Sequence, residues 1–169
     1  MNIVIKFFAV AVMFFSFIVS NAEATELSIP ALEAAAGQTI EIPVIIDKID
    51  NLAGVKLSME YDPEILIFKK ADKTKHTSSL MHIVNDKKPG FLIIVMAGAK
   101  GIKGEKFPVI SMIFEVDKKI NEKKTTQIIL KDVQLMSDKL KDVQHTVSFP
   151  ALTILPGKSE KMQTQEAAD

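Results

Sequence analysis

Hydrophobic and polar residues alternate strictly along residues 53–61, and the alternation stops at the Asp62-Pro63 pair. Side chains at every second position of a β-strand share one face, so the pattern predicts a strand with one buried and one polar face. Proline has no N–H to donate to a neighbouring strand, so we expect the strand to end there in a turn. The expected buried set is Val55, Leu57, Met59 and Tyr61, and the opposite set is Gly54, Lys56, Ser58 and Glu60.

Similar strand signals recur about every ten residues, with turn residues between them and no long helical period. Residues 39–47 and 108–116 also alternate, and Pro43, on the outer side of the first run, predicts a free strand edge at that point. Many short strands with little helix predict an all-β protein, a two-sheet antiparallel β-sandwich. The expected strands are residues 27–29, 39–47, 53–61, 65–69, 80–84, 91–97, 108–116, 125–130 and 146–155.

Three glycines at positions 98, 101 and 104 lie between two of these expected strands, in a segment rich in lysine. Glycine adopts backbone conformations that are closed to other residues, so we expect a flexible loop here. A phosphate-binding glycine motif follows a strand and opens a helix. This segment opens no helix, so we do not interpret it as a phosphate-binding loop.

The two ends of the chain do not fit the sandwich pattern. Lys6, the apolar run Phe7–Ser20 and the Ala22-Glu23-Ala24 motif have the form of a secretory signal peptide cleaved after Ala24. The apolar run is shorter than the roughly 20 residues that span a bilayer, although a retained membrane anchor is the alternative. We therefore expect a secreted protein, periplasmic or extracellular, with no membrane attachment after cleavage. The expected division is a signal peptide over residues 1–24, one domain over 25–156 and a polar, disordered tail over 157–169.

Composition narrows the classes of partner. The 21 basic residues equal the 21 acidic residues in number, so no net charge attracts nucleic acid. Every basic residue is a lysine, so the chain has no arginine to bind phosphate or carboxylate in a bidentate manner. The chain contains no cysteine, so no disulfide stabilises the fold and a hydrophobic core must do so.

No group of residues forms a recognisable catalytic or metal-binding pattern. Zinc sites use three or four ligands, often with two close in sequence, whereas the histidines here are far apart. Calcium takes a dense run of oxygen ligands, which Asp47 and Asp50 alone do not supply. Ser78 and Ser79 lie near two histidines, but a catalytic triad is defined by geometry, not by sequence distance. We expect a non-enzymatic protein without catalytic residues, metal or cofactor; its histidines are His76, His82 and His145.

The aromatic residues bear on a second class of function. Modules that bind flat polysaccharides present tyrosine or tryptophan rings, which combine an apolar face with a polar group. This chain has no tryptophan, and its one tyrosine, Tyr61, falls on the expected buried face. A carbohydrate-binding β-sandwich is therefore the alternative hypothesis to a protein-binding module, and a structural subunit of a surface assembly is the third.

Several segments together resemble the cohesin domain, over about Leu27 to Leu155. They read IPVIIDKIDN, LAGVKLSMEYDPEIL, GFLIIVMAG and FPVISMIFEV, and the strand that closes on Tyr61-Asp62-Pro63 is the most specific of them. The resemblance implies a jelly-roll sandwich of about nine strands without catalytic activity. It also implies a dockerin-like protein partner and a link to polysaccharide breakdown, because cohesins hold the dockerin modules that tether polysaccharide-degrading enzymes to a scaffold.

The resemblance places the partner on one flat sheet face, which includes one side of the strand over residues 53–61. The strand over residues 91–97 adds an apolar centre if its even-numbered residues point inward; the alternative is that loops cover both of its faces. The SDKLKD turn supplies a further, weaker candidate. The candidate partner-binding residues are Gly54, Lys56, Ser58, Ile93, Val95 and Leu140.

This chain departs from the family at two of those positions. Well-known cohesins carry asparagine and aspartate on the partner-facing side where this chain has Gly54 and Lys56. Lysine reverses the local charge, so we expect Lys56 to suit an acidic group on a partner. The partner is therefore expected to differ from the dockerins of cellulosomes.

Overall fold

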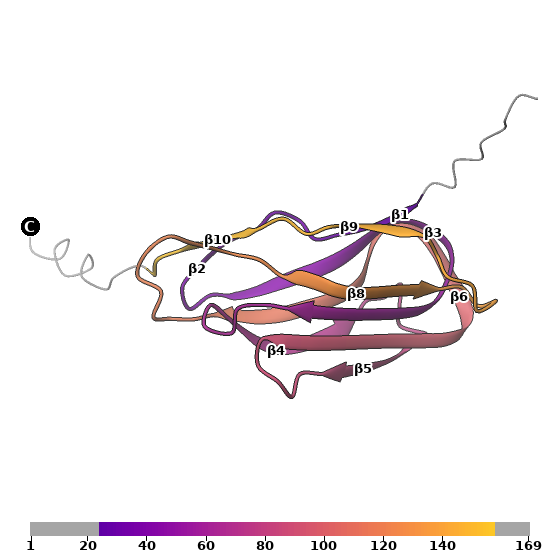
Figure 1. Cartoon of the computed structure of the whole chain (residues 1–169), viewed down its shortest axis with the longest axis horizontal. Helices are drawn as coiled ribbons and strands as arrows, with labels where there is room; N and C mark the ends of the chain where they lie inside the picture. The colour runs from indigo at the N-terminus through magenta and orange to yellow at the C-terminus, as the bar shows by residue number, and fades with distance from the viewer. Residues whose placement is uncertain (1–23, 158–169) are drawn as a thin grey trace, which may run out of the picture.

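Two long strands, β3 (Thr39–Glu60) and β6 (Phe91–Val116), run through the whole of the computed structural model, which describes residues 24–157 (Figure 1). The two strands pair antiparallel, from Thr39 opposite Glu115 to Glu60 opposite Phe91. Shorter strands pair with these two or with one another. They are β1 (Thr25–Ser28), β2 (Glu33–Ala35), β4 (Leu66–Lys73), β5 (Met81–Asn85), β7 (Lys124–Thr126), β8 (Ile129–Met136), β9 (His145–Ser148) and β10 (Leu152–Leu155).

The ladder between β3 and β6 passes from one layer of a β-sandwich to the other. The first layer has the order β9-β1-β3-β6-β4 and uses the first half of β3 and the second half of β6. The second layer has the order β8-β3-β6-β5 and uses the remaining halves of both strands. A small sheet, β2-β10-β7, completes the fold. The expected all-β sandwich is confirmed, although the β1–β9 and β2–β10 ladders are parallel rather than antiparallel.

The buried faces predicted from alternation form one core between the layers. Val55, Leu57 and Met59 are fully buried, and Tyr61 packs edge-on against Phe114 with ring centroids 5.2 Å apart. Burial of apolar surface is the main source of folding free energy, so these positions hold the two layers together. The first layer contributes Ile40, Ile42, Val44 and Ile46 from β3 and Ile110, Met112, Phe114 and Val116 from β6.

Two local predictions about proline are confirmed. β3 ends at a turn in which the Asp62 carbonyl accepts hydrogen bonds from Ile65 N at 3.2 Å and Leu66 N at 2.9 Å. At Pro43, β6 pairs with β3 on one side, whereas the β1 ladder on the other side stops at Ile45. Proline therefore lies where no described strand needs its missing N–H.

The expected loop over residues 98–104 is wrong, because this segment is the middle of β6. The expected strands over 39–47 and 53–61 are likewise one strand, β3. The middle parts of β3 and β6 pair with each other, and the pairing has register shifts around Leu52, where the ladder passes from one layer to the other. A Cβ atom on Gly101 would lie 2.6 Å from Asn51 Cγ and 3.1 Å from Asn51 Cα, so glycine allows the strands to approach closely at this corner.

The C-terminal strands also differ from the prediction. The expected strand over 125–130 is split between β7 and β8, and β8 continues to Met136. The expected strand over 146–155 is split into β9 and β10 around Pro150, where the chain leaves one sheet for the other. In β8 the one fully buried side chain is Leu135, so this edge strand lacks the apolar alternation on which the prediction depended. The short strand β2 was not predicted.

The predicted signal peptide and most of the predicted tail, residues 1–23 and 158–169, lie outside the described residues. Within residues 24–157 no helix is long and apolar enough to cross a membrane.

Gly101 gives a direct test of the close packing at the corner. We expect Gly101→Ala to lower the free energy of unfolding by about 1–3 kcal/mol, because the added methyl group must displace Asn51. Gly157→Ala is the control, since its Cβ would meet Ala36 Cβ at an ordinary 3.6 Å, and we expect a change within about 0.5 kcal/mol. Urea denaturation of the two variants measures both values. Equal stability of the two variants would contradict the packing.

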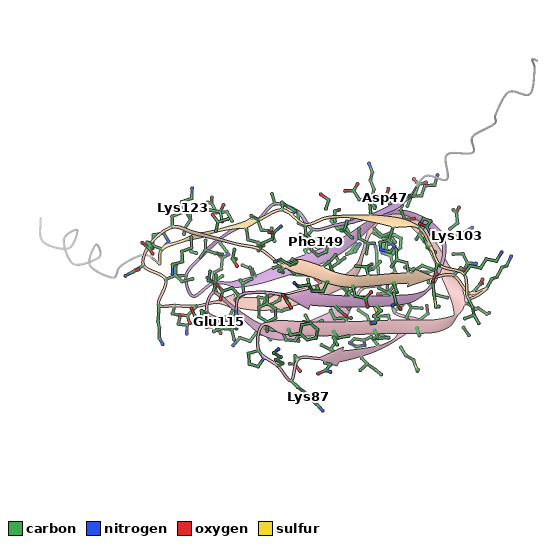
Figure 2. The ribbon with its side chains drawn as sticks, in the orientation of Figure 1. Asp47, Lys87, Lys103, Glu115, Lys123 and Phe149 are labelled. Carbon is green, nitrogen blue, oxygen red and sulfur yellow. The ribbon has the colours of Figure 1, made fainter. Side chains whose placement is uncertain are left out.

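Glu115, at one end of the sandwich in Figure 2, gives a prediction about pH. Its carboxylate lies 2.7 Å from Lys69 Nζ and 3.6 Å from Lys118 Nζ, and the hydrogen bond and charge of Lys69 above all lower the pKa of Glu115. A lowered pKa means that the folded state favours the charged form, so this stabilisation is present above the ordinary pKa of a glutamate and is lost as the pH falls through the folded value.

We therefore expect the stability gap between wild type and Glu115→Gln to be larger at neutral pH than at about pH 3, because protonation removes the ion pairs from the wild type. Urea denaturation at the two pH values and low salt measures the gap, because urea carries no charge and does not screen the ion pairs. Glu122→Gln is the control, because Glu122 is exposed and forms no ion pair among the described residues. A gap for Glu115→Gln that does not change with pH would show that its ion pairs do not stabilise the fold.

Candidate functional site

The outer face of the second layer is a flat array of side chains that the strand register arranges in rows. Residues opposite one another in paired strands point to the same side of a sheet. The four strands β8, β3, β6 and β5 lie next to one another in that order (Figure 1). Across them the rows are Met136-Gly54-Ala97-Met81, Gln134-Lys56-Val95-Ile83, Asp132-Ser58-Ile93-Asn85 and, on three strands, Ile129-Glu60-Phe91.

Five of the six candidate residues come together on this outer face, in the first three rows. Val95 is 39% exposed, whereas Leu92, Ile94 and Met96 point into the core, so loops do not cover the outer side of this strand. Ser58, by contrast, is only 7% exposed, so its neighbours leave it little surface for a partner.

Leu140, the sixth candidate, lies in the turn that follows β8 rather than on a strand. It is 80% exposed, its backbone is left-handed with φ 57°, and its N–H donates to Ser137 O at 3.0 Å. The turn starts directly after Met136, the β8 member of the first row. Leu140 is therefore an apolar side chain beyond the end of that row and not part of the flat face.

Sequence reasoning missed the most exposed apolar side chains of the face. Met81 is 76% exposed and Ile83 is 69% exposed, both on the edge strand β5. The sequence predicts a strand over 80–84, and its period puts Met81 and Ile83 on one face, but it does not indicate which face is buried because both carry apolar residues. On β8 the missed residues are Ile129 and Met136. Of the eight large hydrophobic residues that are exposed within residues 24–157, five lie on this face: Met81, Ile83, Val95, Ile129 and Met136.

Two ion pairs lie on the β8 side of the face and link it to β3. Lys56 Nζ is 2.7 Å from Asp132 Oδ2, and Lys131 Nζ is 2.9 Å from Glu60 Oε2. Lys131 is the extra residue at a register shift in the ladder, between Leu130 opposite Met59 and Asp132 opposite Ser58. The positive charge of Lys56 is thus balanced within the chain by Asp132, a partner that was not predicted from the sequence.

The other candidate groups are dispersed over the molecule. His76 lies against the ring of Phe107, His82 Nε2 is 3.3 Å from Ala71 O, and His145 Nδ1 is 3.1 Å from Val143 O. Across residues 24–157 no group of three or more histidine and acidic residues could hold a metal ion. Ser78 Oγ donates to Lys75 O rather than to a histidine.

Asp47 has a structural role in the backbone around β1. Its Oδ1 accepts hydrogen bonds from Glu26 N at 2.8 Å and Lys48 N at 2.6 Å, and with Asp50 it lines an open hollow of about 450 Å³. Oδ1 of Asp47 therefore holds the backbone of β1 and β3 together at this point.

Comparison with known proteins gives a consistent result for the fold. The family model described as Cohesin domain matches residues 25–150. A comparison with curated protein sequences found no match.

Three solved structures of similar fold are cohesins. A non-cellulosomal cohesin from the archaeon Archaeoglobus fulgidus aligns with a TM-score of 0.69 at 16% identity, over 85% of this chain and 99% of that chain. The cohesin of a type I cohesin–dockerin complex from Clostridium thermocellum gives a TM-score of 0.71 at 16% identity, over 79% and 94%. The sixth cohesin of scaffoldin B from Acetivibrio cellulolyticus, in complex with a Cel5 dockerin, gives 0.68 at 14%, over 79% and 99%. At these identities the likeness shows the fold.

Proposed function

The chain belongs to the cohesin domain family, and from that premise we propose that it is a non-catalytic binding module that docks a dockerin-type protein partner through the outer face of its second layer. The observation that carries the proposal is the distribution of exposed apolar side chains. Five of the eight large exposed hydrophobic residues in the described part of the chain lie on this one face. A contiguous exposed apolar patch on a folded domain is typical of an interaction site.

The geometry of the face suits protein docking. Its two central strands belong to the longest ladder of the fold, so their backbone is held in place before any partner arrives. A preorganised surface loses little conformational entropy on binding. Apolar residues such as Val95 and Ile83 with charged residues beside them match the apolar core and polar rim of protein interfaces.

Structural neighbours support a dockerin as the class of partner. Two of the solved complexes pair a Clostridium thermocellum cohesin with a dockerin, and another pairs a cohesin and a dockerin named CaCohA2 and CaDoc0917. We extend that class of partner to this chain, and with it a role in bringing a dockerin-bearing enzyme to polysaccharide breakdown.

Direct carbohydrate binding stays the alternative, and the aromatic residues give it little support. Tyr61, the one tyrosine, is 9% exposed and packs on Phe114. On the candidate face the one aromatic ring is Phe91, which is half-buried. No row of exposed rings is therefore present on this face to stack on sugar units.

Docking is tested with a panel of purified dockerin modules, comprising those of the source organism and those of the solved Clostridium complexes. We expect at least one to bind the wild-type domain in calorimetry. Val95→Asp should weaken that binding by at least about 30-fold, equivalent to about 2 kcal/mol, because it replaces an apolar contact at the centre of the interface with a charged group.

Ile67→Lys is the matched control for Val95→Asp, because each change puts a charge opposite a residue of the opposite sign in the paired strand, Glu115 and Lys56 respectively. Ile67 is 38% exposed against 39% for Val95, but it lies on β4 in the other layer. We expect Ile67→Lys to bind like wild type and both variants to melt like wild type. Binding unaffected by Val95→Asp would show that the partner uses another surface. Saturable retention of the wild type on cellulose, chitin or xylan, without any dockerin binding, would favour the carbohydrate alternative.

Export is a further part of the proposal. The described domain begins with β1 at Thr25, the residue after the predicted cleavage site. Thr25 N donates to Gln144 O and Thr25 Oγ1 donates to Lys48 O, both at 3.0 Å, so the domain includes the proposed new N-terminus. This arrangement suits cleavage after Ala24, because the fold needs no residue before the cleavage site for these contacts.

Cleavage is tested by expressing the full-length chain in a bacterium and measuring the intact mass of the exported protein. We expect a mature N-terminus at Thr25, because the Ala22-Glu23-Ala24 motif suits signal peptidase. A protein that keeps Met1 and stays in the membrane fraction would contradict export and favour the retained anchor.

A further inference from the structure

We propose that the partner meets this face with an apolar surface that carries no charge at its centre, and that both ion pairs of the face stay intact in the complex. This inference rests on the proposed docking function and specifies the chemistry of the partner. It follows from where charge and apolar area lie among the rows of the second layer.

The apolar part of the face has the shape of an L. One arm is the first row, Met136-Gly54-Ala97-Met81, which contains no charged residue and has no side chain at Gly54. The other arm runs along β5 and β6 and contains Met81, Ile83, Val95 and Ile93.

The first row has the width of one partner helix. Three strand spacings separate Met136 from Met81, about 14 Å in all. A helix with its side chains is about 10–12 Å across, so one apolar helix face can lie on this area.

The charged part of the face is confined to β3 and β8. The four rows contain three charged residues, Lys56, Glu60 and Asp132, and the bulge adds Lys131. These residues form two ion pairs, Lys56 with Asp132 and Glu60 with Lys131. All four side chains are about 40–50% exposed, so water still solvates them.

A partner charge would gain little from these residues. An acidic partner group would have to compete with Asp132, which the fold already holds 2.7 Å from Lys56 Nζ. The intramolecular pair forms without any loss of association entropy, whereas the partner group must be ordered and desolvated. Charge therefore supplies little attraction at the centre of the face, and apolar contact with Ile83, Val95 and Met81 supplies the affinity.

The test uses the dockerin that the wild-type domain binds in the panel, and it compares two kinds of change. The double variant Lys56→Gln/Asp132→Asn removes both charges of one pair at nearly constant shape, and we expect its Kd to stay within about threefold of wild type. Ile83→Asp should raise Kd by at least about 30-fold. Lys56→Glu is not informative here, because it would also place two carboxylates side by side within the domain.

Salt dependence gives an independent readout. Screening weakens attraction between exposed charges, so a charge-driven complex loses affinity steeply between about 50 mM and about 500 mM NaCl. We expect the Kd of the wild-type complex to change by less than about threefold over this range. Thermal melting of every variant checks that it is folded. If Ile83→Asp melts at a lower temperature than wild type, Met81→Ser replaces it, and we expect Met81→Ser to weaken binding as well.

The outcomes separate this inference from the proposed function. If the wild type binds a dockerin but the neutral double variant loses more than about tenfold in affinity, or binding falls steeply with salt, the partner uses charge and the inference is wrong while docking stands. If no dockerin in the panel binds the wild type, the docking function fails and the inference fails with it. Retained affinity in the double variant together with loss in Ile83→Asp supports the inference.

Discussion

The antiparallel ladder between β3 and β6 is the constraint on which the rest of the structure depends. The two strands stay paired from Thr39 opposite Glu115 to Glu60 opposite Phe91, and they change layer together around Leu52. Because one ladder supplies the centre of both layers, the register of one layer fixes that of the other. A slip of β6 by one residue against β3 would turn the core side chains of β6 outward in both layers, so the buried alternation along both strands holds the register.

The candidate face is a direct consequence of this ladder. The part of the ladder that lies in the second layer puts Lys56 beside Val95 and Gly54 beside Ala97 at the centre of that layer. Because the two strands are paired along their whole length, neither can move independently there. The two neighbours, β5 and β8, are edge strands and differ in sequence. β5 presents methionine and isoleucine outward, whereas β8 presents Asp132 and Gln134 between its apolar ends. The rigid centre is therefore flanked by one apolar and one mixed edge.

The sequence predicted the face as far as local periodicity reaches. Alternation depends on neighbouring residues alone, and it placed Lys56 on the outer side and Tyr61 in the core correctly, whereas the uninterrupted apolar run over residues 91–97 left the side of Val95 open. Pairing between distant segments does not follow from it. The contact of Lys56 with Asp132 depends on a bulge at Lys131, and the continuity of β6 depends on the fit of Gly101 against Asn51. Both features arise only when the two long strands are in register.

The difference between the two edges bears on why the face stays open. An edge strand with exposed apolar side chains can pair with other chains, and proteins often protect such edges with lysine, proline or a bulge. β8 has Lys131 at a bulge, whereas β5, with the sequence MHIVN, has none of these devices, and Lys87 follows only in the turn beyond it (Figure 2). Exposed ion pairs add little stability, so those on β3 and β8 are better explained by their effect on the surface. They keep that side of the face hydrated and limit the extent of the exposed apolar area. A partner that buries apolar surface would then bind on the β5 and β6 side. The uneven distribution of apolar residues therefore determines where on the face the partner lies as well as how tightly it binds.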